Sequence, residues 1–249
     1  MGYHYGRYQP PPATPVLVRA RARELALPDP SDHGALRVPP PPADAARMAE
    51  LDVVHRFAAL RTPAVDQWVE HMDHRGATSM WWGTAQRARA DAAGPIAGVL
   101  RSVELRAALV GGQLGALAAT YTPFARRYDR PRPFAMDPSI ELVGARPGTS
   151  SYPSGHTRQA FASARIVARL SPGQADDAWL AARDVAASRV VAGAHLPSDV
   201  AAGARLGVAV GDAVVGAVHA ARVGVPVAGA AAITLAALQP GDEARDSEQ

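Results

Sequence analysis

The chain has 249 residues, of which 48% are hydrophobic and 20% are charged, and its formal net charge is only +3. This length can bury a sizeable core, and the apolar content with the small net charge excludes a mostly disordered chain. The sequence contains no cysteine, which excludes disulfides, thiolate catalysis and thiolate zinc sites. All 26 basic residues are arginines, whose planar guanidinium suits phosphate. No basic stripe with interleaved aromatic residues is visible, so nucleic-acid binding is not predicted.

The first 44 residues are rich in proline and include a run of four. Proline has no backbone N–H to donate and restricts φ, so we expect residues 1–44 to be extended or irregular. No charged segment followed by an apolar one opens the chain, so no signal peptide is predicted. Of the apolar stretches, 206–218 is interrupted by Asp212 and 225–238 is too short to span a membrane. The sequence therefore predicts a cytoplasmic protein without an integral membrane segment.

Apolar residues recur at helical spacing along most of the chain, beginning near Ala43. This periodicity predicts a first helix from near Ala43 to about Leu60. Further helices are predicted over about 63–72, 78–93, 95–121, 155–170, 174–194, 198–221 and 225–238. Alternating strand patterns are almost absent, and residues 129–154 are rich in Pro, Gly and Ser. We therefore expect one all-α domain over 45–238, a helix bundle with a functional loop in its middle, followed by a flexible tail at 239–249.

The first cluster of polar residues, Arg126 to Phe134, places four arginines within seven residues. Such a concentration of positive charge is costly unless it is solvated or holds an anion. The ordinary alternative is a solvated helix end, because cations near a helix C-terminus complement its dipole. The residues of this cluster alone leave both interpretations open.

The second cluster, Ser150 to Thr157, precedes an amphipathic helix. Ser154 stands at the N-cap position, where its hydroxyl and the free backbone N–H groups of the first turn can hold an anion. Gly155 lets a ligand approach the backbone closely, and His156 faces the same place and can donate a proton. A plain serine cap beside a structural histidine would use the same residues.

The third cluster runs from Ser188 to Asp199, and Pro197 within it separates two helices. An aspartate four residues after His195, across that corner, can accept the imidazole N–H and leave the other ring nitrogen as a base or nucleophile. Ser188 and Arg189 lie nearly two turns earlier and add a hydroxyl and a guanidinium for phosphate. A His–Asp pair by itself is common, so the combination of the three clusters carries the prediction.

In this order and spacing, the clusters resemble the three motifs of the type 2 phosphatidic acid phosphatase (PAP2) superfamily: Arg132-Pro133, Pro153-Ser154-Gly155-His156, and Ser188-Arg189 followed by His195 and Asp199. That superfamily also contains the bacterial class A acid phosphatases and the vanadium-dependent haloperoxidases. The soluble acid phosphatases are the branch that the sequence resembles most. The shared features are the proline run before a helix, the pair Arg61-Thr62 and the residues after Ser198. The resemblance implies a single-domain helical bundle of the PAP2/vanadium haloperoxidase type.

The resemblance also implies a metal-independent acid phosphatase that hydrolyses phosphomonoesters or diphosphates through a phosphohistidine, without a cofactor. His195 would attack phosphorus, Asp199 would orient its ring, and His156 would protonate the leaving oxygen. The phosphate would be held by Arg132, Ser154, Gly155, Ser188, Arg189 and, if it reaches the site, Arg126. The substrate would be a phosphorylated small molecule or a prenyl or lipid phosphate, and a homo-oligomer is compatible with the sequence.

The first motif departs from the family at one position. The family's motif begins with a lysine seven residues before the arginine of Arg132-Pro133, and here that position holds Ala125. Arg126 is adjacent, but one residue turns a side chain by about 100° around a helix, so it is not an automatic substitute. Either a neighbouring arginine supplies the charge, or the site holds phosphate less completely than in the relatives.

Two other functions are compatible with the same residues. A vanadium-dependent haloperoxidase would place vanadate in the pocket with His195 as its ligand, although Ala125 stands where that branch uses a lysine on bound peroxide. A degenerate phosphate- or phospholipid-binding module would bind without hydrolysis, but the pair of His195 and Asp199 together with His156 disfavours it. The cluster from His71 to His74 is interpreted as an ordinary exposed helix end, so no metal site is predicted.

Overall fold

The chain folds as a bundle of helices, here in a computed structural model that describes residues 16–30, 38–76, 79–90, 93–118 and 128–223. Every regular element within these ranges is a helix, which confirms the all-α fold class. The predicted helix 225–238, the tail 239–249, Ala125 and Arg126 lie outside the described residues.

The elements follow the sequence signals closely. Thr62 caps the helix that starts at Pro63, because its hydroxyl accepts the Val65 N–H at 3.3 Å, and Pro197 likewise stands in the first turn of its helix. The elements are α1 Val16–Arg21, η1 Ala22–Leu25, α2 Asp44–Ala58, α3 Pro63–Arg75, η2 Ser79–Trp81, α4 Trp82–Ala90, α5 Pro95–Ala118, α7 Pro133–Met136, α8 Gly155–Leu170, η4 Pro172–Gln174, α9 Ala175–Val191 and α10 Pro197–Arg222.

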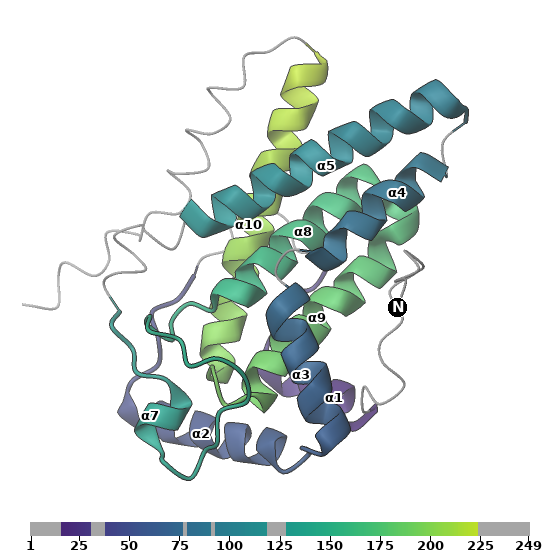
Figure 1. The fold of residues 1–249 in the computed structure, drawn as a ribbon. Helices are drawn as coiled ribbons and strands as arrows, with labels where there is room; N and C mark the ends of the chain where they lie inside the picture. Colours follow the sequence, from purple (N-terminus) through teal and green to yellow (C-terminus); the bar gives the residue numbers. More distant parts are fainter. Residues whose placement is uncertain (1–15, 31–37, 77–78, 91–92, 119–127, 224–249) are drawn as a thin grey trace, which may run out of the picture.

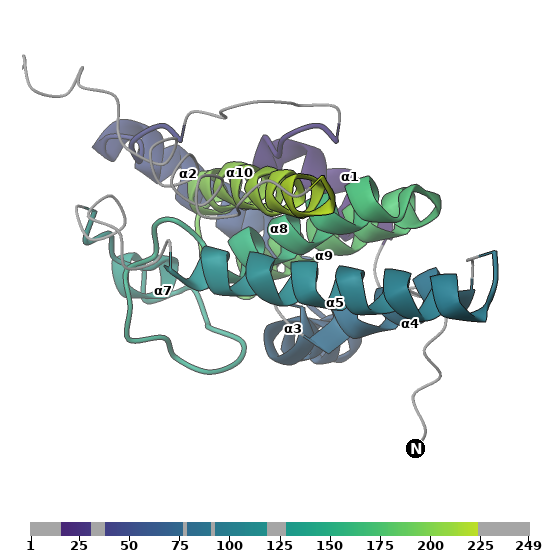
Figure 2. The same cartoon turned by 90° about the horizontal axis from the view of Figure 1, so that it is seen from above.

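Helix α8 lies at the centre of the bundle, packed against α10, α9 and α5 (Figures 1 and 2). Most of its apolar side chains are fully buried; Phe161, for example, meets Trp179 of α9 edge to face, with ring centroids 5.8 Å apart. The loop-rich stretch with the short helix α7 lies at one end of the bundle (Figure 1). That end receives the N-termini of α8 and α10, so the first turns of both helices face the loops there.

The N-terminal part of the chain is more ordered than the sequence predicts. We expect an extended or irregular segment over residues 1–44, and this is wrong for 16–25, which form α1 and η1. No proline occurs between Pro15 and Pro28, so nothing prevents helix formation there. Val18 and Leu25 are buried in the core, and Arg19 pairs with Asp184 of α9 at 2.7 Å. This segment is therefore part of the folded body.

Helix α10 bears on the prediction that no segment spans a membrane. By length and composition it could cross one, so that prediction is not supported. Asp212 interrupts the apolar stretch 206–218, but a membrane-spanning helix can contain one or two charged residues. In the structure, 56% of the most apolar window of α10 is buried inside the bundle. The core helix of a globular protein meets the same test.

Candidate active site

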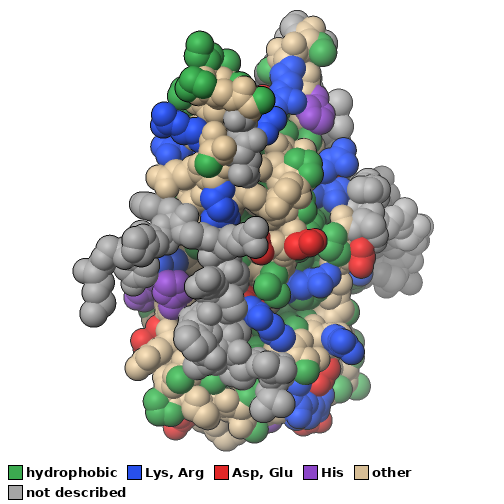
Figure 3. Space-filling view, turned by 90° about the vertical axis from the view of Figure 1, so that its right-hand side faces the viewer, with side chains coloured by type: hydrophobic (Ala, Val, Ile, Leu, Met, Phe, Trp, Pro, Cys, Tyr) green, Lys and Arg blue, Asp and Glu red, His purple; other side chains and the backbone are tan. Residues whose placement is uncertain are grey.

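A pocket of about 580 Å³ opens at the loop end of the bundle. On the face shown in Figure 3, arginine and acidic side chains are interspersed, as on most protein surfaces. The pocket instead gathers three arginines, Arg132, Arg158 and Arg189, and both histidines of the motifs, His156 and His195. Residues from all three sequence motifs therefore line one cavity. Such a concentration of cations around a pocket favours an anionic ligand.

The ring of His195 is held in one tautomer by its two neighbours. Its Nδ1 lies 2.8 Å from the carbonyl oxygen of Ser151, which can only accept, so Nδ1 carries the proton. Its Nε2 lies 3.2 Å from Nη1 of Arg132, which can only donate, so Nε2 presents a lone pair. The nitrogen with the lone pair is thus the one that faces the arginine of the pocket. A neutral imidazole held this way can act as a nucleophile.

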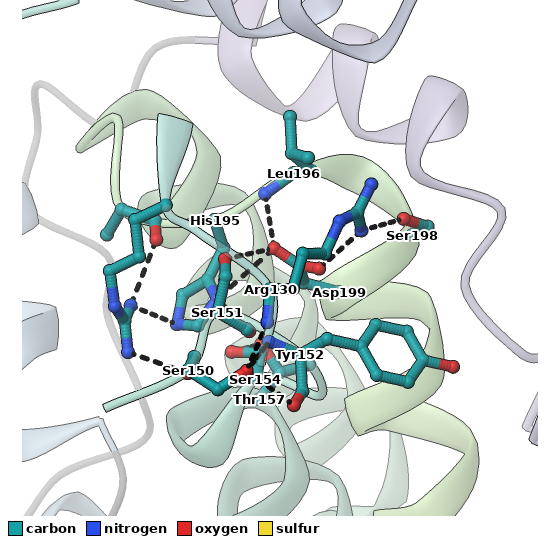
Figure 4. A network of polar contacts seen from close by, with 12 residues as sticks. Arg130, Ser150, Ser151, Tyr152, Ser154, Thr157, His195, Leu196, Ser198 and Asp199 are labelled. Atoms are coloured by element: carbon teal, nitrogen blue, oxygen red, sulfur yellow. Dashed lines mark hydrogen bonds and ion pairs between the residues drawn. The ribbon is translucent and has the colours of Figure 1, made fainter. Parts of the chain in front are cut away.

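Asp199 is the centre of a buried polar network beside His195 (Figure 4). Its carboxylate accepts hydrogen bonds from the Leu196 N–H at 2.8 Å, from Arg130 at 2.6 Å and from the Ser151 hydroxyl. Its Oδ2 is 3.6 Å from Nδ1 of His195. We expected a direct hydrogen bond between this pair, but the Ser151 carbonyl occupies the closer position. Asp199 therefore acts on the ring mainly through its charge and through Ser151.

Arg132 is oriented by the loop that carries the second motif. Its guanidinium donates to the carbonyls of Thr149, Ala194 and Ser150 at 3.0, 3.0 and 3.2 Å, and to the Thr149 hydroxyl at 3.2 Å. The loop carbonyls therefore place this guanidinium beside Nε2 of His195, at the position where a phosphate under attack would need neutralisation.

His156 is at the first turn of α8, as predicted, and lines the pocket. Its Nε2 donates to the main-chain carbonyl of Asp73 at 3.1 Å and lies 3.5 Å from the carboxylate of the same residue. Asp73 itself binds Nη1 of Arg189. The interpretation of residues 71–74 as an exposed helix end is therefore wrong for Asp73, because the fold brings the end of α3 against α9.

The hydroxyls of the two motif serines, Ser154 and Ser188, bind neighbouring protein groups in this structure. Ser154 is fully buried, and its Oγ lies 3.0 Å from the Thr157 hydroxyl and makes no capping bond to the helix. The Ser188 hydroxyl donates to the Val185 carbonyl at 2.7 Å and accepts from Nε of Arg189 at 3.1 Å. Ser188 therefore supports the guanidinium of Arg189, and direct phosphate contacts by both serines stay predictions.

Burial shifts the ionisation of the two histidines in the same direction. Burial is the main reason why the pKa of His195 is lowered. The pKa of His156 is lowered to about 4, first by burial and then by the positive charge of Arg189. For Asp199, burial alone would raise the pKa, but His195, Arg130 and the Ser151 hydroxyl hold it below its ordinary value. The site thus combines neutral imidazoles with an ionised carboxylate near neutral pH.

Sequence reasoning found the motif residues and missed three of their partners. Arg130 is part of the arginine cluster, but nothing in the sequence indicates that it pairs with Asp199. Ser151 looks like an ordinary loop serine, and Asp73 lies more than a hundred residues from Arg189. Charge could have suggested Arg130 and Asp73 as partners of opposite charges, but nothing in the sequence indicates Ser151, because each of the three acts through a contact made in the tertiary structure.

Residues 106–222 match the family model of the PAP2 superfamily. Over this segment the chain is similar to the PAP2 superfamily. The matched segment runs from within α5 to the end of α10 and contains all three motifs. The match confirms the resemblance seen in the sequence and supports a phosphatase activity. Asp73, on α3, lies outside the matched segment.

Among solved structures, the chain is similar to a transmembrane PAP2 type phosphatidylglycerolphosphate phosphatase from Bacillus subtilis. The two share 20% sequence identity with a TM-score of 0.47, over 81% of this chain and 94% of the other. No curated protein matches the chain.

Proposed function

We propose that this chain hydrolyses phosphomonoesters or diphosphates through a phosphohistidine on His195, without a metal ion. The tautomer of His195 carries the proposal: Nδ1–H donates a hydrogen bond to the Ser151 carbonyl, and Nε2 offers its lone pair beside Arg132 in an arginine-lined pocket. In this arrangement arginine charge and protein N–H groups stabilise the developing negative charge, which is the usual role of a metal in phosphate chemistry.

In the proposed first step, Nε2 of His195 attacks phosphorus and forms the P–N bond while the P–O bond to the leaving group breaks. His156 gives its proton to the departing oxygen. Water then attacks phosphorus and gives a proton to His156, the P–N bond breaks, and inorganic phosphate leaves. Arg132, Arg189 and the Gly155 N–H would hold the phosphate oxygens, with Ser154 and Ser188 nearby. Arg126 is proposed as a further phosphate ligand.

The two histidines support an acid phosphatase. The pKa of His195 is lowered, so Nε2 stays unprotonated, and therefore nucleophilic, at a lower pH than in a free imidazole. His156, with a pKa of about 4, carries its proton below that pH, and a phosphate dianion beside it would raise the pKa and extend the protonated range. Both roles are therefore favoured on the acid side of neutrality.

For substrate and compartment, we propose a water-accessible phosphate ester in the cytoplasm. Helix α10 then serves as a core helix, an assignment supported by its burial and by the ion pair of Asp212 with Arg165 of α8 at 2.6 Å. The pocket is large enough for more than one phosphate group, which is compatible with a small ester, a diphosphate or the headgroup of a lipid phosphate.

The test is phosphate release by the full chain from monoesters, nucleotides, prenyl diphosphates and phosphatidic acid, between about pH 4 and pH 8. We expect turnover that is highest at acid pH, and a loss of at least about a thousandfold in kcat for His195→Ala, with no trapped phosphoenzyme. His219→Ala, on α10 outside the pocket, is the matched control and should behave as wild type. Wild-type activity in His195→Ala would refute the nucleophile.

Two other outcomes would replace the proposed function. Halide oxidation with vanadate and peroxide, in the absence of phosphate release, would make the domain a haloperoxidase. Binding of phosphate or vanadate without turnover of any ester would make it a binding module.

A further inference from the structure

Asp73 brings a negative charge to the part of the pocket where Arg189 and His156 lie, and the other acidic residue of the pocket lining is Asp129. Asp73 comes from the last turn of α3, outside the three motifs and outside the segment that matches the family. Its side chain is largely buried, with 18% exposed. A carboxylate at this place needs an explanation, because it repels the anion that the pocket is built to hold.

The Asp73 carboxylate contacts two residues of the proposed phosphate site, Arg189 and His156. One oxygen, Oδ1, binds Nη1 of Arg189 and is 3.5 Å from Nε2 of His156. The other oxygen, Oδ2, faces the loop that contains Gly144, and a Cβ built on Gly144 would lie 3.3 Å from it. Gly144 has φ of +92°, a conformation that favours glycine. The carboxylate is thus held on one side by Arg189 and His156 and on the other by the loop.

Local structure does not favour an acidic residue here. The C-terminal end of a helix carries a partial negative charge, and α3 has His74 and Arg75 in its last turn, as the dipole prefers. An aspartate at the same end is unfavourable by itself. Residues that oppose the local preference are expected where a site requires them.

Arg189 provides the reason for the carboxylate. Its guanidinium is almost fully buried, and its other N–H contacts in the structure are the neutral oxygens of Ser188 and Val69. A buried charge without a counter-charge is strongly destabilising. Asp73 supplies that counter-charge whenever phosphate does not. A phosphate oxygen that binds the same Nη1 N–H of Arg189 would compete with the carboxylate oxygen for it, and the two negative charges would repel each other.

We propose that Asp73 is an internal competitor of phosphate at Arg189, which weakens phosphate binding and so promotes release of the product. The carboxylate holds Arg189 until substrate displaces it, and it returns when inorganic phosphate leaves. This inference rests on the proposed function in one respect, the assignment of Arg189 to the phosphate. Asp73 is therefore a residue that sets phosphate affinity, and it takes no part in bond making.

The test compares binding of inorganic phosphate to the full wild-type chain and to Asp73→Asn, by calorimetry and as competitive inhibition of ester hydrolysis. Asparagine keeps the size and an oxygen for Arg189 but removes the charge. We expect the Kd and Ki of phosphate to fall about tenfold or more, because one repulsive charge has been removed at contact distance. We also expect phosphate to raise the Tm of Asp73→Asn by more than that of the wild type.

The sign of the change separates competition from a structural role. If Asp73 only positions Arg189 and His156, its loss weakens phosphate binding, and unchanged or weaker binding would overturn the proposal. Asp66→Asn is the matched control: this aspartate is on the same helix and pairs with Arg61 at 2.9 Å outside the pocket, so its loss should leave phosphate affinity unchanged. Asp73→Ser provides a second variant if the asparagine variant does not fold.

Failure of the inference and failure of the proposed function give different results. Phosphate binding is measured without turnover, so a wild-type chain that binds phosphate but hydrolyses nothing refutes only the enzyme. A wild-type chain that hydrolyses esters while Asp73→Asn binds phosphate no more tightly refutes only the competition. Absence of phosphate binding in the wild type and both variants would refute both.

Discussion

At the scale of single residues, Arg130 is the cation that pairs with Asp199 beside His195. It is buried, and its guanidinium donates to Asp199 and to the Ser198 hydroxyl at 2.6 Å each and to Glu50 at 2.8 Å. Glu50, on α2, also accepts the backbone N–H of Ser198 at 2.6 Å, in the first turn of α10 where a carboxylate is favourable. Arg130 thus links the aspartate of the site to a helix outside the motifs.

We predict that Arg130→Met destabilises the protein by about 3–5 kcal/mol, because it leaves the buried carboxylate of Asp199 without its cation. The rate of ester hydrolysis should fall as well, since Asp199 and Ser151 together orient the His195 ring. Urea unfolding and steady-state kinetics measure the two effects. Arg222→Met removes an exposed pair with Glu104 and should cost less than about 1 kcal/mol. Equal stability of the two variants would contradict the prediction.

At the scale of elements, the contact between α8 and α10 determines where the second motif lies. Three glycines of α10, Gly203, Gly207 and Gly211, face α8. A Cβ built on Gly203 would lie 2.5 Å from the Ser154 carbonyl oxygen, and one built on Gly207 would lie 2.3 Å from the Arg158 carbonyl oxygen. A Cβ built on Gly211 would lie 2.7 Å from Cβ of Arg165. The two backbones approach this closely only because these positions lack side chains. The N-terminus of α8, with Gly155 and His156, is positioned by this contact.

We predict that Gly207→Ala destabilises the protein by about 1–3 kcal/mol, since the methyl group forces the helices apart. This loss should exceed the gain of about 1 kcal/mol that alanine brings to a helix interior. Gly216, on the same helix, has open space where a methyl group would lie, with no neighbouring atom within 4 Å, so Gly216→Ala should stabilise by about 0.5–1 kcal/mol. Thermal and urea unfolding would show opposite signs, and a stabilising Gly207→Ala would refute the close packing.

At the scale of the whole molecule, two apolar features bear on the compartment. Helix α10 could span a membrane by length and composition, yet more than half of its apolar window is buried. Helix α5 has an outer face with Ile96, Leu100, Val103 and Leu114, each between 60% and 78% exposed. Exposed apolar surface of this kind is typical of contact with a partner or a lipid. The proposal that α10 is a core helix concerns the first feature alone.

We predict that the full chain, expressed in bacteria, is recovered in the aqueous fraction without detergent, because α10 is packed against α8 and joined to it by the pair of Arg165 and Asp212. Fractionation of membranes before and after a high-salt wash measures this. Material released by salt would indicate association at the surface. Material that requires detergent would refute the core-helix assignment and place α10 in the membrane.

The sequence by itself determined the helical class, the order of the motifs and the residues that are proposed to carry the chemistry. These properties depend on local information: helical periodicity, the proline at residue 197, and the Ser-Gly-His run at a helix start. The prediction of an extended or irregular segment was wrong for residues 16–25, which form α1 and η1 although prolines flank them on both sides.

Only the tertiary structure decided the environment of each motif residue. It placed the Ser151 carbonyl where it accepts a hydrogen bond from Nδ1–H of His195, paired Asp199 with Arg130, and set Asp73 of α3 against Arg189 of α9. The physical reason is that burial and charge act over distances in space, and the partners of Arg189 and Asp199 lie far from them in the sequence. Periodicity indicates which face of a helix is buried, but not which element it meets.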